Sequence, residues 1–110
     1  MNIERLKKLV NEANKIDGQN DVLLEENRKK RLQEMSKSLD ETLAYLDVCS
    51  ENELLFATEV LEDLAVIFDN KELIRCIEKN TNRCENTEIK KQLNVTLKYI
   101  KALSQELTDF

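Results

Sequence analysis

The side chains of this chain that could do chemistry are carboxylates gathered on one predicted helix. Glu59, Glu62 and Asp63 follow at three- and four-residue spacing, which places them on one narrow face of a helix. Such a group can act as an acid–base pair, hold a hard cation or attract a basic partner. Glycosidase chemistry needs acids opposed across a cleft, and di-metal bundle sites add Glu-x-x-His ligands. The chain has no histidine, so a weak divalent-cation site is the one metal interpretation left open, and we expect no metal centre.

Nucleophilic catalysis finds no support either. Cys49, Cys76 and Cys84 are odd in number and too widely spaced for a zinc site, which would also need a fourth ligand. We expect them to be reduced, buried thiols. Without histidine or a phosphate-binding glycine loop, no nucleophile–base set can be assembled. The sequence therefore predicts a protein that is not an enzyme and takes no cofactor.

Negative charge is concentrated in the middle of the chain. Ten acidic residues and one basic residue, Lys71, lie between Asp40 and Glu72, which gives −9 against +4 for the remainder. Like charges at this spacing repel, so either a basic partner or internal pairing, for example of Asp63 or Glu62 with Arg75 or Lys79, can offset the repulsion. The predicted partner-binding residues comprise three direct contacts and four that attract from a distance. They are Glu59, Glu62 and Asp63, followed by Asp40, Glu41, Glu51 and Asp69.

A basic run, Arg28-Lys29-Lys30-Arg31, is the one feature that suggests nucleic acid. Four consecutive residues cover all sides of a helix, and no aromatic residue for base stacking is close in sequence. We interpret the run as a solvated helix surface and expect no direct nucleic-acid binding.

These residues must be positioned by helices. The chain has 110 residues, one glycine and no proline, with 41% hydrophobic and 35% charged residues, and its apolar residues recur at three- and four-residue steps. Helix starts are marked by polar caps at the Asp17–Asn20 turn, Ser38, Ser50, Asn70 and Asn86, with Gly18 suited to a left-handed position after the first helix. We predict a loop at 80–82. The fold expected for residues 1–110 is one all-α domain of five to six antiparallel helices, a bundle or a short HEAT-like array.

The helix after Ser50 should be the central one. Leu54, Ala57, Leu61, Leu64 and Phe68 form one apolar stripe on it, and a second stripe lies beside the first, formed by Phe56, Val60 and Ile67. A helix that is apolar over so wide an arc is typical of one with neighbours on two sides.

Targeting signals are not evident. The amino terminus alternates charged with isolated apolar residues, and no window reaches the roughly twenty apolar residues of a membrane span. We expect a cytoplasmic protein without membrane contact.

Several segments together resemble small helical immunity proteins encoded beside polymorphic toxins, including those of contact-dependent growth inhibition systems. The segments are Leu6-Lys7-Lys8-Leu9-Val10-Asn11-Glu12-Ala13-Asn14-Lys15-Ile16-Asp17, Leu39-Asp40-Glu41-Thr42-Leu43-Ala44-Tyr45-Leu46, Thr58-Glu59-Val60-Leu61-Glu62-Asp63-Leu64-Ala65 and Lys71-Glu72-Leu73-Ile74. The resemblance implies a protein that binds and neutralises a cognate toxin domain in the cytosol, often a nuclease whose basic cleft an acidic face can fill. That family often has an aromatic-rich central helix, whereas here only Phe56 and Phe68 are found there.

Two other functions fit the residues. A helical adaptor would dock an amphipathic partner helix in a groove, and an oligomeric bundle would be structural. Toxin binding through acidic residues should be salt-sensitive, whereas groove docking should be mainly apolar and less so.

Overall fold

The computed structural model describes the backbone of residues 1–68 and 71–108 and the side chains of residues 1–68 and 71–103. All of its regular structure is helical, and no strand occurs within these residues. The six helices are α1 (Ile3–Lys15), α2 (Asp21–Met35), α3 (Leu39–Val48), α4 (Glu51–Phe68), α5 (Lys71–Arg83) and α6 (Thr87–Thr108). The predicted all-α fold is confirmed.

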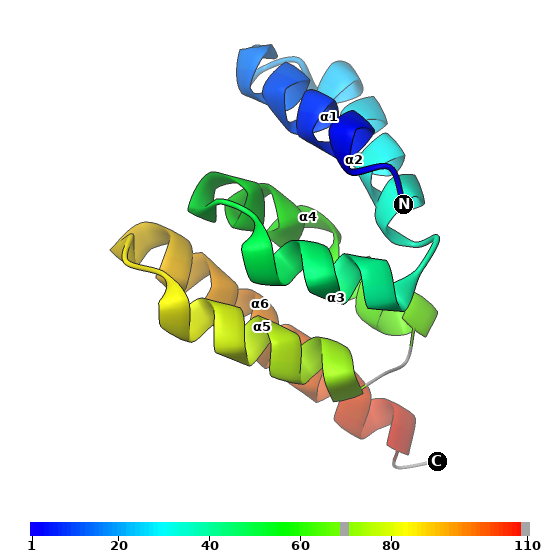
Figure 1. Cartoon of the computed structure of the whole chain (residues 1–110), viewed down its shortest axis with the longest axis vertical. Coiled ribbons are helices and arrows are strands. Elements are labelled where there is room, and N and C mark those ends of the chain that lie inside the picture. Colours follow the sequence, from blue (N-terminus) through cyan, green and yellow to red (C-terminus); the bar gives the residue numbers. More distant parts are fainter. Residues whose placement is uncertain (69–70, 109–110) are drawn as a thin grey trace.

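Three helical hairpins stack in chain order, α1/α2, α3/α4 and α5/α6 (Figure 1). α4 packs against α2 on one side and α6 on the other, and α5 packs against α3. The second helices of the hairpins therefore form a layer in the order α2–α4–α6, backed by the first helices. One hydrophobic core runs from Leu6 in α1 to Ile100 in α6.

The cap residues explain where most helices begin. Ser38 Oγ accepts from the Glu41 amide, and Ser50 Oγ accepts from the Glu53 amide at 3.1 Å while donating to that residue's carboxylate. Asn20 and Asn86 cap α2 and α6 in the same way. These four predicted starts are confirmed, while Asn70 lies outside the described residues.

Gly18 does not have the left-handed conformation that we predicted. α1 ends instead at Lys15, and Ile16 leaves the helix in extended backbone (φ −74°, ψ 134°). The turn closes further on, where Asp17 accepts from the Gln19 amide. The Ile16 amide donates to the Ala13 carbonyl at the end of α1, and the Asx-type bond of Asp17 then shapes the turn without a glycine cap.

The predicted loop at 80–82 is wrong, because α5 continues to Arg83. Asn80 donates from Nδ2 to the Cys76 carbonyl and to Asp47 of α3, both at 2.9 Å. The Thr81 hydroxyl donates to the Ile77 carbonyl at 2.7 Å. Both side chains are buried, and their bonds to the preceding turn and to α3 override the low helix propensity of asparagine and threonine.

α4 is the central helix, as predicted. Leu54, Leu61 and Leu64 are almost wholly buried, and α4 has packing partners on two sides. The second predicted stripe is only partly correct, because Ile67 is 53% exposed and Phe56 is half-buried. The arc of α4 around residues 55, 59, 62 and 66 faces solvent.

All three cysteines are free and buried, which confirms their predicted role as buried thiols. Burial raises the pKa of Cys49 to about 12 and that of Cys76 to about 11. Because the thiolate is the nucleophilic form, these two groups are unreactive at neutral pH.

Candidate partner-binding surface

An open groove of about 570 Å³ runs between α2 and α4. It is lined by Asp21, Leu24, Glu25 and Arg28 of α2 and by Glu59 of α4. We call it the α2–α4 groove. One of the three predicted contact residues therefore lies in a concavity of the surface.

A buried arginine holds Glu59 in place. Arg31 Nη2 donates to the Glu59 carboxylate at 2.6 Å, Nη1 donates to the Phe56 carbonyl at 2.9 Å, and the guanidinium lies 5.3 Å from the centre of the Phe56 ring. Arg31 Nε donates to Asn27, which in turn donates to the Leu9 carbonyl. The side chain of Arg31 is only 3% exposed, so our interpretation of the basic run as solvated is wrong at this position.

Asp63 is also paired within the chain. Arg28 Nη1 donates to its carboxylate at 2.8 Å and, through Nε and Nη2, binds Glu25. The hydrogen bonds to Glu25 and Asp63 raise the pKa of Arg28 further above its already high value. The internal pairing that we considered for Asp63 does occur, but its partner is Arg28 of α2 rather than a residue of α5. Lys79, the other candidate, pairs with Asp47 at 3.0 Å.

Glu62 differs from its two neighbours. It is exposed and forms no ion pair with any described residue. Four carboxylates lie in or next to the groove against the two guanidinium groups of Arg28 and Arg31, and the surface is negative on balance. Asp21, Glu25 and Glu59 line the groove, and Asp63 binds Arg28, which also lines it. Glu62 lies three residues from Glu59 on the exposed arc of α4.

The three described residues among those predicted to act at longer range, Glu41, Glu51 and Asp40, do not line the α2–α4 groove. Glu41 pairs with the amino terminus, and Glu51 accepts from the amides of Glu85 and Asn86 before α6. These bonds, that of Asn86 foremost, lower the pKa of Glu51. Asp40 is exposed in the first turn of α3, and Asp69 lies outside the described residues.

Our sequence reasoning missed the contribution of α2. Asp21, Glu25 and Arg28 are spaced four and three apart, so the signal for a shared helix face was present. We interpreted the residues at positions 28–31 only as a solvated basic run. The pairing of this face with α4 could not be seen, because the two segments are more than thirty residues apart in sequence.

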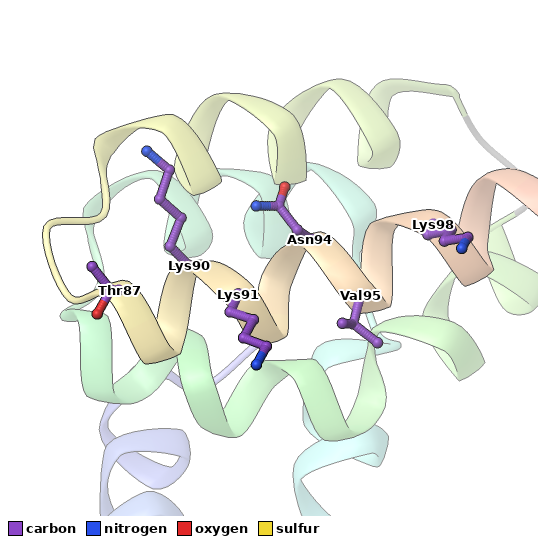
Figure 2. A pocket seen from close by; sticks show the side chains of 6 residues that line it. All are labelled: Thr87, Lys90, Lys91, Asn94, Val95 and Lys98. Atoms are coloured by element: carbon purple, nitrogen blue, oxygen red, sulfur yellow. The ribbon is translucent and has the colours of Figure 1, made fainter.

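A second, basic surface lies on α6. A shallow depression of about 500 Å³ is lined by Thr87, Lys90, Lys91, Asn94, Val95 and Lys98. Figure 2 shows Lys91 and Val95 on the side of α6 next to α4, and Lys90 and Asn94 on the side next to α5. None of the three lysines forms an ion pair with a described residue.

No group of three or more potential ligand side chains in the described part of the chain is arranged to hold a metal ion. Among the described helices, none has the length and apolar character needed to span a membrane. No protein-family model matches the chain, and comparisons with curated proteins and with solved structures found no match.

Proposed function

We propose that the chain is a non-catalytic binding protein whose α2–α4 groove receives a basic protein surface. The observation that carries the proposal is the groove itself, which combines a concave shape, one apolar lining residue, Leu24, and an excess of carboxylates. Interfaces of this composition gain fast, electrostatically steered association. Glu62, three residues from Glu59 on the exposed arc of α4, is the strongest candidate for a further contact, because it forms no ion pair with a described residue.

The ion pairs beneath the groove support the same function. Arg31 and Arg28 fix Glu59 and Asp63 at rigid helical positions. Both carboxylates stay about half exposed, 46% and 49%. Carboxylates held in this way lose little side-chain freedom when a partner binds, which lowers the entropic cost of association.

The resemblance to toxin immunity proteins gives the partner its most specific description. On that basis the partner is a cognate toxin domain, for instance a nuclease with a basic substrate cleft, and binding in the cytoplasm neutralises it. The acidic groove would then occupy the surface that the toxin uses for nucleic acid.

A cell-protection assay tests this proposal. The protein encoded by the neighbouring upstream reading frame is expressed in cells together with this chain or a variant. Asp21, in the groove, and Glu62, three residues from Glu59 on α4, form no ion pair with a described residue, and reversing both (Asp21→Lys with Glu62→Lys) should abolish protection. The matched control, Glu4→Lys with Glu12→Lys on α1, makes the same change in net charge and should protect fully. Equal protection by both variants would exclude the groove as the neutralising surface.

A helical adaptor is the second candidate, and one observation favours it. Apolar side chains are exposed on α4 and α6, among them Val66 at 60% and Val95 at 42%. An amphipathic partner helix could cover such residues. Binding that weakens little with added salt, and is lost on Val66→Ser or Val95→Ser, would favour the adaptor over a basic toxin partner.

A further inference from the structure

The exposed arc of α4 combines an acidic side chain with apolar ones. Leu55, Glu62 and Val66 lie at seven- and four-residue spacing, so they share one face. Leu55 is 36% and Val66 60% exposed, and Glu62 is exposed and forms no ion pair with the residues that the structure describes. Covering this arc would therefore remove two apolar side chains from water and bring a partner's charge to Glu62.

The exposed arc of α6 has the same pattern with the opposite charge. Lys91, Val95 and Lys98 follow at four- and three-residue spacing, which again gives one face. Both lysines are exposed, and Val95 is 42% exposed between them. Residues 71–103 have eight basic and four acidic side chains, whereas residues 1–68 have nine basic and fifteen acidic ones. Charge is therefore divided between the α5/α6 hairpin and the rest of the described chain.

These two arcs lie next to each other. α4 and α6 are adjacent in one layer and bury their opposite sides in the common core. Lys91 and Val95 project from the side of α6 next to α4 (Figure 2). The outer surface of the layer therefore has an acidic and apolar strip beside a basic and apolar strip.

Such a surface is complementary to itself. Consider a two-fold axis that lies in this face and runs lengthwise between α4 and α6. Rotation by 180° about it places the basic strip of a second copy opposite the acidic strip of the first, and the acidic strip of the second opposite the basic strip of the first. Each contact then occurs twice, as in any two-fold interface. The assembly is therefore complete with two copies, whereas a contact between two different surface patches would leave one patch on each copy free to bind a further copy.

We propose that the chain forms a two-fold homodimer through this α4–α6 face, which comprises Leu55, Glu62 and Val66 of α4 and Lys91, Val95 and Lys98 of α6. Ion pairs at the two strips set the orientation, and the exposed leucine and valines lose contact with water at the centre. The proposal does not depend on the identity of any other partner. Because Glu62 takes part in both surfaces, dimer formation and binding at the α2–α4 groove compete.

Analytical ultracentrifugation of the isolated full chain tests the dimer. We expect dimers at about 10 mM salt, where the Debye length is about 30 Å, and dissociation at about 1 M salt, where it is about 3 Å. Lys91→Glu with Lys98→Glu should weaken the dimer at least about tenfold, as should Glu62→Lys with Val66→Lys. An equimolar mixture of these two variants should form a heterodimer, because each strip again meets its opposite charge.

The mixture also shows whether the variants are folded. If the two variants associate with each other, their failure to self-associate cannot be due to misfolding. A matched control, Lys7→Glu with Lys8→Glu on α1, makes the same charge change as the α6 variant and should leave the dimer intact. A parent chain that stays monomeric at low salt overturns the proposal. So does a failure of the mixed variants to associate when the parent does.

Discussion

At the scale of single residues, the most consequential side chain is Arg31. It is buried, yet its guanidinium has four partners on two helices: Glu59 and the Phe56 carbonyl and ring on α4, and Asn27 on α2. Asn27 in turn donates to the Leu9 carbonyl of α1. A buried charge is tolerated only when paired and hydrogen-bonded in this way. Arg31 therefore links the packing of α1, α2 and α4 to the position of the groove carboxylate.

Arg31→Ala should lower the free energy of unfolding by about 2–4 kcal/mol, because it leaves Glu59, the Phe56 carbonyl and Asn27 without their donor and opens a cavity. Lys30→Ala, the neighbouring exposed position, should change it by less than about 0.5 kcal/mol. Urea denaturation of both variants measures the difference. Equal midpoints would show that the Arg31 network contributes nothing to stability.

Glu34 makes stability depend on acid pH. Its carboxylate accepts from the Asn2 amide at 3.0 Å and from Lys37 at 2.8 Å, and these bonds, that of Asn2 foremost, hold its pKa below the ordinary value of 4.5. A lowered folded-state pKa contributes stability that is fully present above the unfolded pKa and is lost as pH falls through the folded one.

The stability difference between the parent and Glu34→Gln should therefore be largest near neutral pH and shrink as pH falls below 4.5. Denaturant titrations at a series of pH values give this difference directly. The control is Glu12→Gln, on the exposed face of α1. Its free energy of unfolding should differ from that of the parent by the same amount at every pH. A Glu34→Gln difference that is independent of pH would refute the assigned role.

Residue types alone predicted some of these roles and missed others. Burial of Cys49, Cys76 and Cys84 followed from their chemistry, because free thiols behave as small apolar groups. The burial of Arg31 did not, since arginine is rarely buried and its partner Glu59 lies 28 residues away. Pairing between distant segments is a property of the fold, which a local pattern does not contain.

At the scale of helices, local sequence signals predicted starts better than ends. Asn20, Ser38, Ser50 and Asn86 cap helices as expected, because a capping side chain bonds within three residues of its own position. The end of α5 was missed, because Asn80 is stabilised by Asp47 on another helix. Tertiary contacts decided that boundary.

Asn80→Ala should destabilise the protein by about 1–3 kcal/mol, because it removes buried hydrogen bonds to Asp47 and the Cys76 carbonyl. Asn82→Ala, on the exposed side of the same helix, serves as the control and should be neutral or slightly stabilising, since alanine favours helix. Thermal unfolding of the two variants decides the matter. If Asn82→Ala proved as costly as Asn80→Ala, helix propensity rather than the α3 contact would be responsible.

Leu64 of α4 is fully buried at the centre of the core. Leu64→Ala should cost about 2–5 kcal/mol, as expected for a large-to-small change in a packed interior. Val66→Ala, two residues further and 60% exposed, should cost far less. Similar denaturant midpoints for the two variants would place the core elsewhere.

At the scale of the whole molecule, the division of charge is the property most closely tied to function. The acidic stretch from Asp40 to Glu72 was visible in the sequence, but in the structure Asp47, Glu51, Glu59 and Asp63 already bind groups within the chain. The field of the α2–α4 groove therefore depends on a few unneutralised carboxylates. Reversing the charge of one of them should therefore change the rate constant for association with a basic partner.

We propose that the α2–α4 groove, together with Glu62 on the neighbouring arc of α4, attracts a basic protein partner. The most direct test is the association rate constant between this chain and the protein encoded by the neighbouring upstream reading frame. We measure it for the parent, Glu62→Lys and the control Glu12→Lys at low and high salt. Glu62→Lys should slow association about 3- to 10-fold and reduce its salt dependence, with Glu12→Lys close to the parent. Identical rate constants and identical salt dependence for all three proteins would contradict the account.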